Sequence, residues 1–150
     1  MKILSKFIAT FFGAGYFPLA PGTFTSLICV LLYKFYLVRM SWPLYILLLL
    51  SFFVLGALVS SVYSHELKKK DPKKVVIDEA FGQFLVLFRM TESWALLVMS
   101  FVFFRLFDII KPYPIRKIEE FPGGWGIMLD DLVAAIYAGI AVYTYLLIKS

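Results

Sequence analysis

The stretch GGWGIMLDD, from Gly123 to Asp131, places two adjacent carboxylates at the start of an apolar run that continues to Ile148. A second acidic pair, Asp78 and Glu79, opens another apolar segment in the same way. An aspartate at the centre of a membrane helix costs about 2.5–3.5 kcal/mol, and the cost is lower near the interface. A helix start also favours negative charge. Carboxylates that merely start helices are therefore one interpretation, but it does not explain why the arrangement occurs twice.

A further acid, Asp108, lies between two bases, Arg105 and Lys111, and Arg116 follows shortly after. Several carboxylates gathered on one face need cations. Oxygen ligands without cysteine or histidine suit Mg²⁺, which also accepts phosphate oxygens as ligands. The basic side chains could bind those phosphate oxygens, and the arginines offer bidentate geometry.

Three glycines, Gly123, Gly124 and Gly126, come just before the helix start at Asp130. Glycines at such a position allow the backbone to approach a phosphate closely. Each of these signals is weak alone, but acids, bases and a glycine-rich turn together favour phosphoryl chemistry on a lipid. The sequence patterns of thiol-based, haloacid-dehalogenase-like and histidine-based phosphatases, and of CDP-alcohol phosphotransferases, are absent.

The composition is that of an integral membrane protein. The chain has 150 residues, of which 61% are hydrophobic, whereas a soluble domain is usually about 45–50% apolar. Its length suits a single domain over residues 1–150. The net charge of +5 comes from bases in short loops between apolar segments, which indicates membrane topology and argues against nucleic-acid binding.

The hydrophobic pattern predicts an all-α integral membrane protein, a small bundle of about four membrane segments. Residues 3–12 have an apolar helical face and read as an interfacial helix, followed by a Gly/Pro-rich turn. Segment 80–104 is interrupted by polar residues 89–92, so it is either one long interrupted span or a tight helical hairpin. The four apolar segments are residues 24–38, 43–63, 80–104 and 132–148.

The distribution of basic residues favours the hairpin. With a hairpin at 80–104, eleven bases fall on one side of the membrane and only three, Arg39, Arg89 and Lys149, on the other. The positive-inside rule then makes the first side cytoplasmic, and all the acids discussed above lie there too. The eleven bases are Lys2, Lys6, Lys68, Lys69, Lys70, Lys73, Lys74, Arg105, Lys111, Arg116 and Lys117.

Three blocks of the sequence resemble the phosphatidylglycerophosphatase A family: FGAGYFPLAPGTFTS (12–26), DEAFG (78–82) and FRLFDIIKPYPIRKIEEFPGGWGIMLDDLVAA (104–135). The resemblance implies a multi-pass, Mg²⁺-dependent enzyme of the bacterial inner membrane, with its active site facing the cytoplasm. Its phospholipid substrate would be phosphatidylglycerophosphate, hydrolysed to phosphatidylglycerol and phosphate in phospholipid biosynthesis.

The resemblance also implies roles for individual residues. One or two Mg²⁺ ions would be held by Asp78, Glu79, Asp130 and Asp131. The substrate phosphates would be held by Arg105, Lys111, Arg116, Thr23 and Gly124. Asp108 would be a metal ligand, a base, or the partner that orients Arg105. Water is the expected nucleophile, and an aspartyl-phosphate intermediate is the alternative.

Two positions depart from the family pattern. Pro122 stands where members often have a histidine, and Glu119-Glu120 stand where they often have an Asp-Arg pair. Segment 117–122 is therefore assigned no role. Two other functional classes stay open, a small cation-binding transporter or channel subunit and a non-catalytic membrane scaffold.

Overall fold

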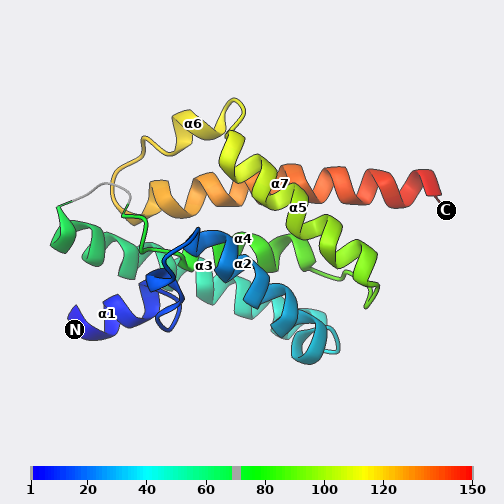
Figure 1. Cartoon of the computed structure of the whole chain (residues 1–150), viewed down its shortest axis with the longest axis horizontal. Coiled ribbons are helices and arrows are strands. Elements are labelled where there is room, and N and C mark those ends of the chain that lie inside the picture. Colours follow the sequence, from blue (N-terminus) through cyan, green and yellow to red (C-terminus); the bar gives the residue numbers. More distant parts are fainter. Residues whose placement is uncertain (1, 69–71, 150) are drawn as a thin grey trace.

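The computed structural model describes residues 2–68 and 72–149, and over these ranges the chain forms helices and no strands (Figure 1). The prediction of an all-α fold is confirmed. Lys69 and Lys70 of the basic side lie outside the described residues. The α-helices are α1 (Lys2–Ala9), α2 (Pro21–Leu32), α3 (Trp42–Leu67), α4 (Ile77–Leu87), α5 (Trp94–Ile110), α6 (Ile115–Ile118) and α7 (Gly124–Lys149). A 3₁₀ turn, η1 (Ala14–Tyr16), precedes α2, and a π-helical turn, η2 (Tyr33–Leu37), ends it.

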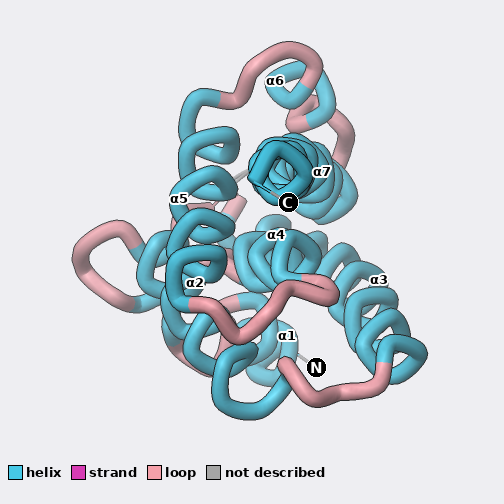
Figure 2. The backbone as a smooth tube through the Cα atoms, turned by 90° about the vertical axis from the view of Figure 1, so that its right-hand side faces the viewer, coloured by secondary structure: helices cyan, strands magenta, loops and turns pink. Residues whose placement is uncertain are grey.

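Helix α4 lies at the centre of the bundle. It packs against α2, α3, α5 and α7, and the end-on view shows it surrounded by these helices (Figure 2). Its buried side chains Ala80, Phe81 and Phe84 contribute to the main hydrophobic core. Because α4 touches so many neighbours, groups at its first turn are held in a fixed position relative to α2, α5 and α7.

Segment 80–104 forms a hairpin. Helices α4 and α5 are joined by a turn over residues 88–93 and pack against each other. Helix ends leave backbone carbonyls without partners, and three tyrosines donate to the carbonyls here. The hydroxyl of Tyr45 donates to Phe84 O (2.7 Å), that of Tyr33 to Met90 O (2.6 Å), and that of Tyr143 to Phe88 O (2.8 Å). The hairpin brings the start of α4 and the end of α5 to one side.

Two helices are long and apolar enough to cross a membrane. Helices α3 and α7 have 26 residues each, about 39 Å at 1.5 Å per residue, whereas the hydrocarbon core of a bilayer is about 30 Å thick. The other predicted segments form shorter helices, with 17 residues in α5 and 11 in α4. Two spanning segments are thus supported by length and composition, and the predicted total of about four stays a prediction.

The N-terminal segment is helical, but it ends earlier than predicted. Helix α1 stops at Ala9, because Phe11 and Phe12 adopt positive φ angles of 45° and 56° that turn the chain. Ile3 and Leu4 are exposed, while Phe11 is buried and packs against Phe52 with ring centroids 6.2 Å apart. The interfacial position of α1 stays a prediction.

The tyrosine contacts at the hairpin turn allow a test of what holds α4 in place. Replacing Tyr45 with Phe leaves the Phe84 carbonyl buried without its donor, which costs about 1–3 kcal/mol. We expect Tyr45→Phe to lower the unfolding temperature in detergent by several degrees. Tyr36, which is 74% exposed, gives the matched control Tyr36→Phe. Equal unfolding temperatures for the two variants would contradict this account.

Candidate active site

Eight of the ten functional residues predicted from the sequence line one cavity of about 460 Å³. Its wall is built from the starts of α2, α4 and α7, the end of α5, and the segment that carries α6. These elements are far apart in the sequence, and their charged side chains meet only because α4 holds α2, α5 and α7 together. The charged residues that line the cavity are Lys73, Asp78, Glu79, Arg105, Asp108, Lys111, Arg116, Glu119, Glu120, Asp130 and Asp131.

Three carboxylates form a compact group, which we refer to as the acidic trio: Asp78, Glu79 and Asp131. One oxygen of each lies within 4.8 Å of the others. Asp78 and Glu79 come from the first turn of α4 and Asp131 from the third turn of α7. The prediction that the last helix starts at Asp130 was wrong, because α7 begins at Gly124 and includes the glycines of the predicted turn from that residue on. Glu79 Oε2 and Asp131 Oδ2 are buried without a hydrogen-bond partner among the described residues. Buried polar atoms are normally paired, so these orphaned oxygens mark a place for a ligand.

The electrostatics of the trio favour a cation. Burial raises the pKa of the Glu79 carboxyl to about 7; the charge of Asp108 adds to this rise, whereas a hydrogen bond with Asp78 and the charge of Arg105 oppose it. Burial thus disfavours the charged form, and a divalent cation would restore it. Oxygen ligands alone, with no cysteine or histidine in the group, fit Mg²⁺ better than a softer metal.

Gly22 explains how α2 reaches the trio. A Cβ atom at this position would collide with the Glu79 carboxylate and would lie 3.1 Å from Arg105 Nη2. Only glycine therefore lets the first turn of α2 approach these side chains. Helix N-termini carry a partial positive charge and unpaired N–H groups, so α2 brings a region that favours anions to the cavity wall. The sequence signal for this role was the PGT turn, from which Thr23 was predicted instead.

Asp108 pairs with Arg105 on α5. Arg105 Nη1 lies 2.8 Å from Asp108 Oδ2, one turn further along the helix, and both side chains are largely buried. Of the three roles considered for Asp108, this geometry fits the partner that orients Arg105. The guanidinium also lines the cavity, where it can face a phosphate while Asp108 holds it.

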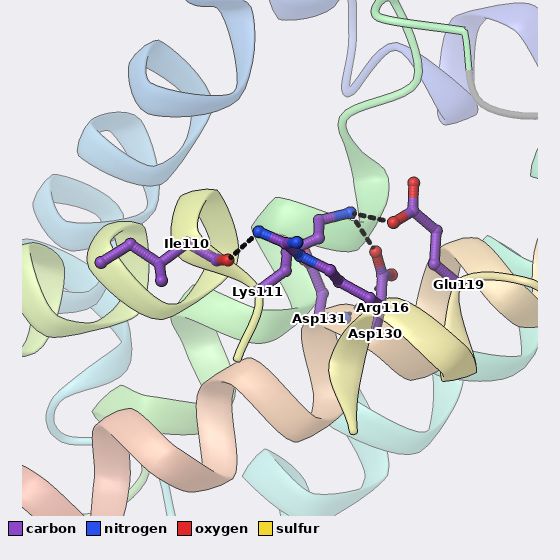
Figure 3. Close-up of polar contacts among 6 residues, drawn as sticks. All are labelled: Ile110, Lys111, Arg116, Glu119, Asp130 and Asp131. Carbon is purple, nitrogen blue, oxygen red and sulfur yellow. Dashed lines mark hydrogen bonds and ion pairs between the residues drawn. The ribbon is translucent and has the colours of Figure 1, made fainter. Parts of the chain in front are cut away.

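Lys111 is held by two carboxylates (Figure 3). Its Nζ donates to Asp130 Oδ2 at 2.6 Å and lies 3.2 Å from Glu119 Oε2. Burial alone would lower the pKa of Lys111, but the two carboxylates raise it above its ordinary value. Asp130 thus has a base as its partner and lies outside the acidic trio, so its predicted role as a metal ligand is not the one that this geometry favours.

Glu119 belongs to the segment for which sequence reasoning assigned no role. In the sequence, Glu119 and Glu120 were noted only as a departure from the family pattern, because their part in the cavity depends on how the loop after α5 folds back over α7. Lys73 lines the cavity as well, and in the sequence it was only one base in a charged loop. No signal in the sequence distinguished these three residues.

Two predicted phosphate-binding residues, Thr23 and Gly124, do not line the cavity, whereas Arg116 does. The N–H of Gly124 donates to Ser61 Oγ at 2.7 Å, and a Cβ atom there would collide with the Ala57 carbonyl. Gly124 therefore lets α7 pack closely on α3. Gly123 and Gly22 are the glycines at the cavity wall.

The chain is similar in sequence to a family of known proteins. The family model described as Phosphatidylglycerophosphatase A matches residues 7–146. A Haemophilus influenzae protein named phosphatidylglycerophosphatase A is 36% identical over 138 residues, covering 91% of this chain and 85% of that protein. An Escherichia coli protein of the same name is 31% identical over 138 residues, covering 91% and 80%.

A third relative carries a different name. A Bacteroides thetaiotaomicron protein, provisionally named phosphatidylinositol-3-phosphatase, is 34% identical over 149 residues, covering 94% of this chain and 92% of that protein. No solved structure matches the chain significantly.

The raised pKa of Glu79 generates a prediction about pH. The pKa in the fold is about 7 against an ordinary value of 4.5, so the folded state holds the proton more tightly than the unfolded state. This contribution to stability is fully present below about pH 4.5 and is lost as the pH rises through 7. Without divalent cations, we expect the unfolding temperature to fall between pH 5 and pH 8.

The variant Glu79→Gln should reduce this fall, because the amide has no charge to desolvate. At pH 8, adding Mg²⁺ should raise the unfolding temperature of the wild type more than that of Glu79→Gln. Differential scanning fluorimetry in detergent, with and without EDTA, measures both effects. An identical pH dependence in the two proteins would contradict the assignment of Glu79 as a buried carboxylate of the site.

The different partners of Asp130 and Asp131 predict different effects on metal affinity. Asp131→Asn removes an oxygen of the acidic trio, and we expect at least about 10-fold weaker binding of Mn²⁺. Asp130→Asn breaks the ion pair with Lys111 and should change Mn²⁺ affinity by less than about threefold. Titration followed by electron paramagnetic resonance measures free Mn²⁺ directly. An equal loss in both variants would show that Asp130 is also a ligand.

Proposed function

The chain belongs to the phosphatidylglycerophosphatase A family, and we propose that the acidic trio holds Mg²⁺ for the hydrolysis of phosphatidylglycerophosphate to phosphatidylglycerol and phosphate. The protein is thus a phosphoric monoester hydrolase acting on a phospholipid. The observation that carries the role of the metal is the meeting of three carboxylates within 4.8 Å beside a cavity lined with bases.

The chain's own residues would position the substrate. Arg105, oriented by Asp108, and Lys111, held by Asp130 and Glu119, lie where they can bind phosphate oxygens. A bound divalent cation neutralises phosphoryl charge and activates water. Phosphoryl transfer depends mostly on such positioning and charge stabilisation. Water attacks phosphorus, the P–O bond to the glycerol breaks, and a proton passes to the leaving oxygen.

The arrangement of the acids supports an enzyme over the two other classes. A cation transporter would be expected to carry acids within its spans, along a route for the ion. Here the acids gather at one cavity, beside Arg105 and Lys111. They lie in the first turn of α4 and at the seventh and eighth residues of the 26-residue α7, near one end of that helix rather than along its length. A scaffold with plain helix-starting acids has no need for a cavity of this kind.

The charge distribution supports a cytoplasmic site in the bacterial inner membrane. Arg39 lies 3.8 Å from Glu92 in the hairpin turn, and Arg89 belongs to the same turn. Lys73, Arg105 and the other bases of the cavity lie at the opposite end of the hairpin. Under the positive-inside rule, the end richer in Lys and Arg faces the cytoplasm.

Hydrolysis of a phosphoinositide is a second candidate, favoured by the name of the Bacteroides relative that is 34% identical. Both lipids carry a phosphate monoester on a hydroxylated headgroup, and the acidic trio would act on either in the same way. Purified protein should therefore be assayed on both lipids in mixed micelles. Faster release from phosphatidylinositol 3-phosphate than from phosphatidylglycerophosphate would favour the second candidate.

The catalytic prediction concerns the acidic trio. Loss of a metal ligand should cost more than the roughly 10–100-fold typical of residues that only support one. We expect Asp131→Ala and Glu79→Ala to lower kcat for phosphate release from phosphatidylglycerophosphate by at least about 100-fold, and EDTA to abolish wild-type turnover until Mg²⁺ is restored.

A matched control is Glu92→Ala, an acid in the hairpin turn at the opposite end, which should retain near wild-type turnover. Near-normal turnover in both Asp131→Ala and Glu79→Ala, with protein that elutes as a single detergent-solubilised species, would refute the metal-centre assignment.

A further inference from the structure

Exposed apolar side chains border one side of the cavity. The cavity wall includes Ala20 at the start of α2, and Arg105 and Asp108 at the end of α5. Next to such lining residues in the chain are four large apolar residues whose side chains are exposed, which we refer to as the apolar rim. The rim consists of Leu19, Leu106, Ile109 and Ile110, exposed by 76%, 43%, 69% and 52%.

The apolar rim continues along both helices. On α5, Val98, Val102 and Leu106 are exposed at a spacing of four residues, so they share one helical face. On α2, Leu27 and Leu31 are exposed at the same spacing. Large apolar patches on a protein surface mark contacts with membranes or partners. Two outward apolar faces that lead to one charged cavity are suited to a ligand with a polar end and an apolar end.

Other lining residues of the cavity are polar and exposed. Lys73, Arg116 and Glu120 line the cavity and are themselves exposed. Such side chains are suited to water, through which the nucleophile arrives and phosphate leaves. The cavity thus has one charged, exposed border and one apolar, exposed border.

We propose that the acyl chains of the lipid substrate leave the cavity between the start of α2 and the end of α5, across the apolar rim. This inference rests on the proposed function, because it assumes a lipid phosphate in the cavity. The phosphate of such a lipid is joined covalently to its acyl chains, so a headgroup beside the acidic trio must extend toward apolar surroundings. The rim is the border of the cavity that provides them.

A second apolar groove offers the natural comparison. It lies between α3, α4 and α7, has a volume of about 320 Å³, and is lined only by apolar residues, among them Leu50, Phe53 and Leu132. None of its lining residues also lines the charged cavity. An acyl chain seated there would not be continuous with a headgroup at the acidic trio.

The test compares hydrolysis of a lipid substrate with hydrolysis of its headgroup alone. Phosphatidylglycerophosphate in nonionic mixed micelles and its deacylated, water-soluble headgroup are assayed for phosphate release with the full chain. For Leu19→Gln and Ile109→Gln, we expect the ratio of kcat/KM for the lipid to that for the headgroup to fall at least fivefold. Leu50→Gln, which is 57% exposed in the wild type, is the matched control and should change this ratio less than twofold.

The outcomes separate the inference from the function on which it rests. If both rim variants keep the wild-type ratio of lipid to headgroup kcat/KM, or if this ratio falls only in Leu50→Gln, the inference is overturned and the proposed function stays intact. If the wild-type protein is a dimer and both rim variants are monomers, the rim is an interface between copies of the chain. That result also overturns the inference. A wild type that hydrolyses neither substrate would refute the proposed function itself.

Discussion

The structure of the site depends on keeping three buried carboxylates, which carry like charges, close to one another. Two carboxylates about 4 Å apart repel each other by about 4 kcal/mol at the effective dielectric constant of 20 that suits protein sites. The acidic trio brings three within 4.8 Å, and burial deprives them of water. Such a group is stable when it is protonated or when a cation lies between its oxygens. The raised pKa of Glu79 favours the protonated form, and a bound divalent cation would instead stabilise the charged form.

Several features of the fold support this placement. Helix α4 is only 11 residues long, and tyrosine hydroxyls complete the hydrogen bonds of its last turn and of the loop that follows. The hairpin can therefore reverse inside the protein without leaving buried carbonyls unpaired. Glycine at position 22 lets α2 approach Glu79, and glycine at position 124 lets α7 approach α3. Together these contacts bring the first turns of α2 and α4 and the N-terminal part of α7 to one cavity.

The bases of the cavity divide its acids into two groups. Asp108 pairs with Arg105, and Asp130 with Glu119 pairs with Lys111, so these carboxylates fix cations that can face a phosphate. Glu79 and Asp131 instead keep buried oxygens that lack hydrogen-bond partners among the described residues. A carboxylate that pairs with a base and a carboxylate that would bind a metal play different roles, although both are aspartate or glutamate side chains. This division gives the two groups of acids different proposed roles.

Much of the site could be predicted from the sequence, because hydrophobic periodicity, charge and motif spacing are local properties. The helices, the acidic pair that opens α4, the bases near Asp108 and the family followed from these properties, and the hairpin was one of two stated alternatives. The predicted helix start at Asp130 was wrong, because α7 begins at Gly124. The division of labour between Asp130 and Asp131 did not follow, since adjacent residues on a helix point about 100° apart and only packing decides what each one faces. The same holds for Gly22, Gly124 and Glu119. The sequence by itself determined which charges the protein carries and that they lie near the ends of apolar segments. The tertiary structure decided which of them meet, because contact between distant segments depends on how α4 packs among its neighbours.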